Sequence, residues 1–258
     1  MKKICEDLLV HSLEQLSSRH WLMRLRSSSQ LPEMLPGQFV QIRVEHSPST
    51  YLRRPISINM VDYEKNELLL LIAAVGEGTR QLVRLQPGER VNCLYPLGNG
   101  FTMPSSPKEN CLLIGGGVGT APLLFLGRRI AEMGAQPTFL LGARTSSELL
   151  EKDMFRKYGE LYLTTEDGSE GESGFVTGHS ILRQKRFDRI ATCGPKPMML
   201  SVARYAKREN ITCEVSLEND MACGLGACLC CVENTTEGHI CVCKEGPVLN
   251  IKKLLWPL

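Results

Sequence analysis

Residues 111–122 of this 258-residue chain read CLLIGGGVGTAP, an apolar segment that runs directly into a glycine-rich turn. The segment predicts a buried β-strand, and the residues beyond the turn predict a helix through Met133. A turn at this junction suits phosphate, because free N–H groups and the helix dipole face the ligand there. Thr120 stands where the usual dinucleotide fingerprint has its last glycine, and a turn of this kind can also be purely structural.

Strand and helix patterns alternate beyond this turn. We expect strands at 137–141, 161–164 and 189–192 and a helix near 148–158, which is typical of a doubly wound parallel sheet. Cys193-Gly194-Pro195 follows a strand end, where such sheets bind ligands, although a free cysteine is more often an apolar filler. Residues 142–146 after the second strand contain no acidic residue, so charge does not decide between NAD and NADP.

The first hundred residues follow a different pattern of short alternating segments separated by turn residues. Residues 21–26 and 38–44 alternate at period two, and residues 68–75 form an apolar run typical of a strand buried on both faces. Several such strands at close spacing predict a small antiparallel barrel or sandwich.

Two stretches of this region carry candidate binding groups. In residues 52–58, Arg54 can fork onto a phosphate while Ser57 hydrogen-bonds a polar ring edge. Residues 75–79 form a glycine turn whose N–H groups can cradle a pyrophosphate before a helix that starts at Thr79. A surface arginine pair and an ordinary turn are the plain alternatives, and the two stretches are more informative together than singly.

Six of the eleven cysteines fall within residues 223–243. Cys223, Cys228 and Cys231 have the C-x4-C-x2-C spacing of the clustered ligands of a plant-type [2Fe–2S] site. Cys241 and Cys243 are both candidates for the fourth ligand, and the period of a strand would place them on one face.

Zinc and disulfides are the alternatives for these cysteines. Structural zinc usually pairs two short cysteine knuckles, whereas three candidate ligands crowd one loop here. Disulfides need an oxidising compartment, and the start at Met1-Lys2-Lys3 does not resemble a secretory signal. We therefore favour an iron–sulfur centre, with Cys230 as a spectator.

Composition narrows the class of protein further. The net charge is +2 without a basic tract, so nothing suggests a nucleic-acid partner, and the apolar run at 68–75 is far short of the ~18 residues of a membrane span. Cysteine usage predicts a cytoplasmic protein. We expect three units: a barrel at 1–104, an α/β domain at 105–212 and a cluster module at 213–258.

The order of these motifs resembles the ferredoxin–NADP reductase superfamily. With the C-terminal cysteine module, the chain is similar to the electron-transfer subunits of type B dihydroorotate dehydrogenase, a family of iron–sulfur flavoproteins. Residues 53–58, 96–101 and 243–248 carry the resemblance most specifically. The wider superfamily usually has an aromatic residue where Ile56 stands.

The resemblance implies a set of cofactor contacts. It assigns FAD to Arg54, Pro55, Ile56, Ser57, Leu71, Ile72, Ala73, Gly78 and Thr79. It assigns the cluster to Cys223, Cys228, Cys231 and Cys243, and the nucleotide stretches become NAD contacts at Gly115, Gly116, Gly117, Gly119, Thr120, Cys193, Gly194 and Pro195. No catalytic acid or base is named, and Cys193 is the candidate for support beside the nicotinamide.

The resemblance also implies a function. Dihydroorotate would be oxidised at the FMN of a separate catalytic subunit, in a heterotetramer with two copies of each chain, for pyrimidine biosynthesis. Electrons would pass through [2Fe–2S] and FAD to NAD⁺, because a flavin can exchange both single electrons and a hydride. The alternatives are a reductase subunit for another partner, of the sulfite reductase or NADH-dependent ferredoxin–NADP reductase type, and a non-catalytic redox sensor or zinc-stabilised adaptor.

Overall fold

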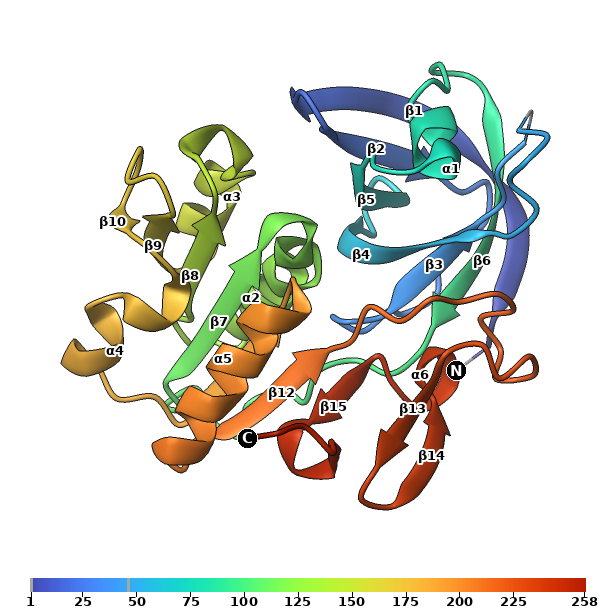
Figure 1. Ribbon diagram of the computed structural model, residues 1–258. Helices are drawn as coiled ribbons and strands as arrows, with labels where there is room; N and C mark the ends of the chain where they lie inside the picture. The colour runs from blue at the N-terminus through green and yellow to red at the C-terminus, as the bar shows by residue number, and fades with distance from the viewer. Residues whose placement is uncertain (1, 46) are drawn as a thin grey trace.

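The computed structural model describes residues 2–45 and 47–258. An N-terminal barrel lies beside an α/β sheet, and the C-terminal segment packs below the barrel and against the sheet edge (Figure 1). These three parts correspond to the barrel, the nucleotide-binding sheet and the cysteine module that the sequence predicts, so the predicted fold class is confirmed.

Six antiparallel strands close the barrel in the order β1-β2-β5-β4-β3-β6. Their bounds are β1 Ile4–Ser17, β2 His20–Arg26, β3 Phe39–Ile42, β4 Arg54–Asp62, β5 Glu67–Ala73 and β6 Arg90–Leu97, with helix α1 Glu77–Leu82 between the last two. β5 is buried on both faces because one face fills the barrel core while Leu71 packs against the neighbouring domain.

The second domain is a seven-stranded sheet in the order β10-β9-β8-β7-β11-β12-β15. Its strands are β7 Cys111–Gly116, β8 Thr138–Ala143, β9 Glu160–Thr165, β10 Glu172–Ser173, β11 Arg189–Cys193, β12 Thr212–Ser216 and β15 Val248–Asn250. All neighbouring pairs are parallel except β12 and β15. The parallel sheet was predictable from its alternating pattern, whereas β15 joins it from the C-terminal segment.

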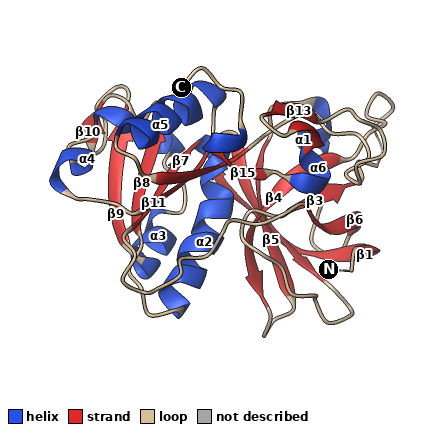
Figure 2. Cartoon of the chain, turned by 90° about the horizontal axis from the view of Figure 1, so that it is seen from below, coloured by secondary structure: helices blue, strands red, loops and turns tan. Residues whose placement is uncertain are grey.

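Helices cover both faces of this sheet, with α2 and α3 on one side and α5 on the other (Figure 2). The helices are α2 Ala121–Glu132, α3 Lys152–Tyr158, α4 Ile181–Gln184 and α5 Lys196–Arg208, and the 3-10 helices are η1 Gly117–Thr120, η2 Ser146–Glu148, η3 Val176–Gly178 and η4 Ile251–Lys253. The expected helix at 148–158 is shorter than predicted, because Glu151 has a φ of 52° and separates η2 from α3.

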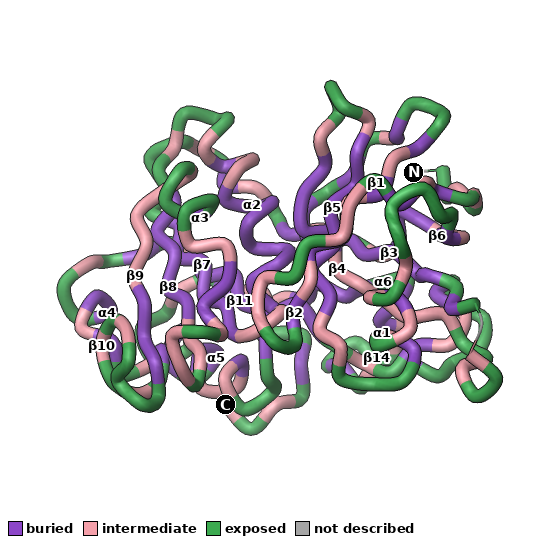
Figure 3. The backbone as a smooth tube through the Cα atoms, turned by 90° about the horizontal axis from the view of Figure 1, so that it is seen from above, coloured by how far each residue is buried: buried purple, intermediate pink, exposed green. Residues whose placement is uncertain are grey.

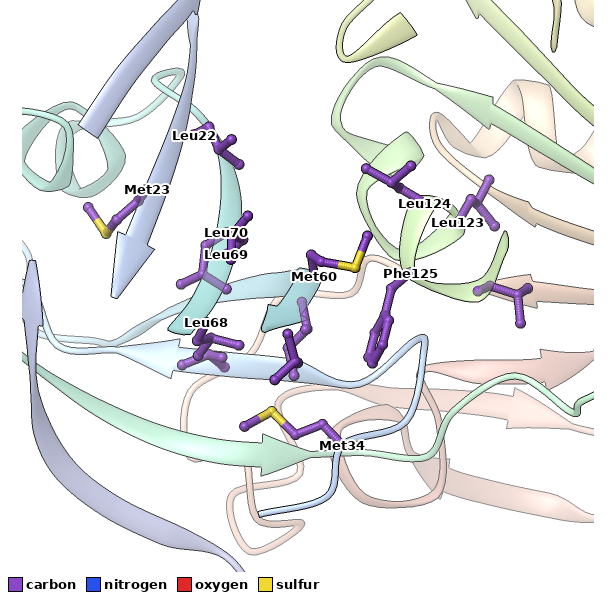
Figure 4. Close-up of a cluster of buried hydrophobic side chains, with 14 of the residues drawn as sticks. Leu22, Met23, Met34, Met60, Leu68, Leu69, Leu70, Leu123, Leu124 and Phe125 are labelled. Atoms are coloured by element: carbon purple, nitrogen blue, oxygen red, sulfur yellow. The ribbon is translucent and has the colours of Figure 1, made fainter. Parts of the chain in front are cut away.

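Apolar side chains join the barrel to the sheet domain. Met60 of β4 and Phe125 of α2 are almost fully buried, and both belong to one cluster that also includes Leu68 and Leu70 of β5 (Figure 4). Buried segments of the barrel strands lie next to the buried part of α2 (Figure 3). Because fully burying one such side chain contributes about 1.5–3 kcal/mol, this interface holds the two domains in a fixed arrangement.

The C-terminal segment consists of a loop, a hairpin and a short helix. The loop at 223–231 leads into β13 Val232–Thr235 and β14 Gly238–Cys241, after which α6 Val242–Glu245 precedes β15. The expected boundary between residues 212 and 213 falls within β12. Among the described residues no helix is apolar and long enough to cross a bilayer, the longest being α5 with 13 residues.

Candidate functional site

The two nucleotide-binding stretches meet at the carboxyl ends of β7 and β11. These strands are parallel neighbours, with Gly115 opposite Cys193. A Cβ atom on Gly119 would lie 2.5 Å from the Cys193 oxygen and from the Gly194 nitrogen, so only glycine allows the two loops to touch. Gly117 has a φ of 56° and open space beside it, and Thr120 Oγ1 donates to its carbonyl at 2.9 Å.

The same two loops also meet at Gly116 and Pro195. A Cβ atom on Gly116 would come within 3.3 Å of Pro195 Cδ and within 2.7 Å of Met198 Sδ. All eight residues predicted to contact NAD thus belong to one continuous edge of the sheet. This edge is a cradle of close-packed backbone at which a phosphate-bearing ligand can reach N–H groups.

Cys193 has a neighbour that the sequence did not predict. Its side chain is fully buried, and its Sγ donates to Glu218 Oε1 at 3.9 Å. Burial raises the pKa of the Cys193 thiol well above its usual range and also raises that of the Glu218 carboxyl. The Cys193 thiol therefore stays protonated at the edge where the nicotinamide would lie.

The candidate flavin residues come from two separate stretches that the barrel brings together. A Cβ atom on Gly78 would lie 3.2 Å from Arg54 Cδ and 3.0 Å from Thr50 Cγ2, so the arginine stem packs on the first turn of α1. The Arg54 guanidinium is oriented by the Leu52 carbonyl, to which its Nη2 donates at 2.9 Å. Thr79 Oγ1 accepts from Gly76 N–H at 3.1 Å and fixes the turn.

The two arginines of this stretch have different roles. Arg53 Nη1 donates to the carbonyls of Gln41 and Asn92 at 3.2 and 3.0 Å, so it ties β3 to β6. Arg54 instead donates to the nearby Leu52 carbonyl, and its stem lies beside Gly78 in the first turn of α1. Of the two, Arg54 is the one that fits a flavin pyrophosphate.

The remaining flavin candidates lie on two strands. Pro55, Ile56 and Ser57 are half-buried in β4, opposite Gln41, Val40 and Phe39 of β3. On β5, Leu71 packs against Ala121, the first residue of α2, while Ile72 lies in the barrel core and Ala73 is partly exposed. Strand β5 therefore contacts helix α2, which follows the glycine-rich turn.

In the cysteine loop, backbone N–H groups point at sulfur. Leu225 N–H and Ala227 N–H lie 3.3 and 3.4 Å from Cys223 Sγ, and Gly226 N–H lies 3.1 Å from Cys243 Sγ. Cys243 N–H donates in turn to Cys231 Sγ at 3.3 Å. The left-handed φ values at Gly224 and Gly226, 69° and 82°, make this curl possible.

The four predicted ligands differ in exposure: Cys228 is exposed, Cys223 is partly exposed, and Cys231 and Cys243 are buried. N–H donors, led by Leu225, lower the pKa of the Cys223 thiol to about 6, whereas burial raises that of Cys243 to about 12. Within residues 2–45 and 47–258, no three His, Cys, Asp or Glu side chains already form a metal-binding group. The four cysteines nevertheless lie in one loop and the helix that follows its hairpin, and three of their sulfurs accept backbone N–H groups, which fits the four-cysteine requirement of a [2Fe–2S] centre.

The structure separates the two candidates for the fourth ligand. Cys241 ends β14 and Cys243 lies in α6, so the expectation that they share one strand face is wrong; the chain turns into a helix between them. Cys243 is fully buried and receives a backbone N–H, whereas Cys241 Sγ points to the Gly226 carbonyl at 3.7 Å. Cys230 is exposed, and its Sγ donates to the Asp220 carbonyl at 3.6 Å. These contacts favour Cys243.

The cysteine segment is fixed to the barrel by the two remaining motifs of the resemblance. Asn99 N–H donates to the Gly246 carbonyl at 2.6 Å, and Asn99 Nδ2 donates to the Glu245 carbonyl at 2.9 Å. A Cβ atom on Gly98 would lie 2.5 Å from Pro247 Cδ. The contact leaves no room for a side chain, so the cluster loop has a fixed place beside the barrel.

Comparison with known proteins agrees with this geometry. Residues 218–255 match the family model of the iron–sulfur cluster binding domain of dihydroorotate dehydrogenase B. The chain is 38% identical to the dihydroorotate dehydrogenase B (NAD(+)) electron transfer subunit of Shouchella clausii, over 85% of this chain and 86% of that one. It is 36% identical to the corresponding subunit of Bacillus velezensis, over 98% and 99%.

Solved structures give the same architecture. The structure of an NADH-dependent reduced ferredoxin-NADP oxidoreductase matches with a TM-score of 0.87 and 28% identity, over 96% of this chain and 90% of that one. The ferredoxin reductase in carbazole 1,9a-dioxygenase matches with a TM-score of 0.68 and 20% identity, over 82% and 67%, which shows the fold alone.

Proposed function

The chain belongs to the electron transfer subunits of dihydroorotate dehydrogenase B, and from this premise we propose that it relays electrons from an FMN-containing catalytic subunit to NAD⁺. It is an oxidoreductase of the NAD-linked iron–sulfur flavoprotein kind and acts with a partner subunit. The observation that carries the proposal is the placement of a cysteine loop, whose sulfurs accept backbone N–H groups, against a barrel that abuts a parallel α/β sheet.

When bound, the [2Fe–2S] centre and FAD supply single-electron transfer and its conversion to hydride chemistry. Each is held by residues of this chain. We propose that Cys223, Cys228, Cys231 and Cys243 ligate the cluster. Residues 54–57, 71–73 and 78–79 hold FAD, with Arg54 on the pyrophosphate.

At the sheet edge, the residues proposed for NAD are Gly115, Gly116, Gly117, Gly119, Thr120, Cys193, Gly194 and Pro195. The tight contact between residues 119 and 194 aligns the nucleotide against the barrel. Cys193 is fully buried beside this position, and its Sγ donates to Glu218 Oε1 at 3.9 Å. Burial raises the pKa of the Cys193 thiol, so the thiol stays protonated and presents an uncharged group to the ring. These residues position the nucleotide without serving as its acid or base.

The face proposed for the catalytic partner is the cysteine loop. Leu225 and Leu229 are 44% and 65% exposed there, and Cys228 is also exposed. Apolar side chains around candidate ligands suit a docking surface that brings a second cofactor close. We propose that this partner carries FMN and that the assembly contains two copies of each chain. The high cysteine content supports a cytoplasmic location, because cysteines stay reduced there and available to a cluster.

Anaerobic co-purification tests the proposal. The tagged chain is expected to retain an FMN-containing partner, and the complex is expected to reduce NAD⁺ when dihydroorotate is added. Substitution of Cys228 by serine is expected to abolish this activity while NADH-dependent reduction of dyes persists through FAD. A complex that lacks FMN, or that does not respond to dihydroorotate, would reject the assignment of the partner.

A second candidate has one observation in its favour, the TM-score of 0.87 to the NADH-dependent ferredoxin-NADP oxidoreductase structure. In that case the chain would serve a different flavoprotein partner. The same purification distinguishes the two, because this candidate predicts NADPH and ferredoxin as reactants in place of dihydroorotate.

A further inference from the structure

Gln41 has a buried side chain whose polar atoms both lack a partner. It is 0% exposed in the middle of β3, and neither Nε2 nor Oε1 makes a hydrogen bond to any of residues 2–45 and 47–258. Burial of an unpaired amide costs about 1–3 kcal/mol, so a partner is expected in the working protein. Gln38, just before the same strand, shows the ordinary case: its amide donates to the Gly98 carbonyl at 2.9 Å and accepts from Leu35 N–H at 2.8 Å.

The Gln41 side chain lies between the barrel and the cysteine loop. Its neighbours Val40 and Ile42 point into the barrel core, so Gln41 points outward. A Cβ atom on Gly224 would lie 3.0 Å from Gln41 Cγ and 3.2 Å from Gln41 Nε2. Gly224 directly follows the ligand candidate Cys223, so the amide approaches the loop at its first ligand.

Backbone N–H groups donate to three sulfurs of this loop. Cys223, Cys231 and Cys243 accept from N–H groups of the loop and of α6. The Gln41 amide approaches the loop from the barrel side, whereas these N–H groups belong to the loop itself and to α6. Sulfur atoms that carry thiolate or sulfide charge are the acceptors available at this place once a cluster is bound.

We propose that Gln41 is a positioning residue for the [2Fe–2S] centre, with its Nε2 donating to a sulfur of the centre beside Cys223. The proposal rests on the cluster assigned above and adds a role for the barrel. A hydrogen bond to sulfur stabilises the more negative, reduced centre more than the oxidised one, which raises the reduction potential. Gln41 of β3 also lies opposite Pro55 of β4, one of the residues proposed for FAD. Gln41 therefore lies between the cluster loop and the proposed flavin site.

The test is an EPR-monitored redox titration of the holoprotein with Gln41→Met, which keeps length and removes the donor. We expect the ratio of reduced to oxidised cluster at a fixed ambient potential to fall about tenfold, which is a shift of about 59 mV to lower potential for one electron. The FAD potential should stay unchanged.

Gln38→Met is the matched control on the same segment. It removes an amide with partners, so we expect a lower melting temperature and an unchanged cluster potential. If Gln41→Met fails to retain a cluster, Gln41→Glu decides, because it preserves shape, lacks the N–H donor and should shift the potential in the same direction. An unchanged cluster potential, or a shift confined to FAD, overturns the proposal. A wild-type protein without any reduced-cluster signal would instead refute the proposed function.

Discussion

Substitution of Gly119 by alanine tests how the nucleotide edge is built. The new Cβ would lie 2.5 Å from the Cys193 oxygen and from both the nitrogen and Cα of Gly194. Ordinary carbon contacts begin near ~3.5 Å, so the overlap is about 1 Å against backbone atoms that cannot rotate away. Overpacking of this kind costs about 1–3 kcal/mol, which corresponds to a melting temperature lower by about 2–12 °C.

Two measurements on the purified flavoprotein follow this change. Calorimetry should show the lower melting temperature, and NADH-dependent dye reduction should show a raised KM for NADH, because the loops at 115–120 and 193–195 no longer meet. Gly178→Ala is the control: its Cβ would have open space, so its unfolding free energy should stay within about 0.5 kcal/mol of the wild type. A Gly119→Ala protein with normal stability and normal KM would refute the account of this contact.

Three further predictions concern the other sites. Arg54→Ala should weaken FAD binding about 10- to 100-fold, measured by fluorescence titration of flavin-depleted protein, because a charge-assisted bond to phosphate is lost; unchanged affinity would contradict this. Cys228→Ser should lose the cluster absorbance and its iron, while Cys230→Ser should keep both, and equal iron in the two variants would exclude the ligand set. Burial raises the pKa of Glu151 from 4.5 to about 7, so the folded protein holds a proton that the unfolded chain releases, and stability falls as pH rises across that window. Glu151→Gln, which keeps an acceptor for Asn59, should therefore add up to about 3 kcal/mol to the unfolding free energy at pH 8 and nothing at pH 4 in thermal melts; an equal gain at both pH values would contradict the assignment.

Local patterns were enough to predict most elements of the fold. The apolar run in β5, the strand before Gly115 and the period change after residue 109 each depend on neighbours in sequence, and the barrel and parallel sheet follow from them. The family assignment, which depends on motif order, is confirmed by the relatives.

Features that depend on distant residues were not predictable in this way. Cys193 meets Glu218 only because β11 and β12 lie side by side, and Gln41 meets Gly224 only because the cysteine loop folds back onto the barrel. The strand β15 is three residues long and has no pattern of its own, so its pairing with β12 emerges only from the folded chain.

The prediction that Cys241 and Cys243 lie on one face of a strand was also wrong. A short helix begins at Val242, and it turns one cysteine into the protein and leaves the other partly exposed. Residues 241–243 contain no glycine or proline that would signal the change. The choice of the fourth ligand therefore depends on tertiary contacts, above all on Gly226 N–H and Cys243 Sγ.

The most direct test of the central claim, that one chain links a nicotinamide site, a flavin and a two-iron centre, is low-temperature EPR after anaerobic addition of NADH to the purified wild-type protein. The account predicts the signal of a reduced [2Fe–2S] centre, in an amount comparable to the bound FAD. Protein that contains zinc in place of iron, or that shows no paramagnetic signal while NADH is consumed, would contradict it.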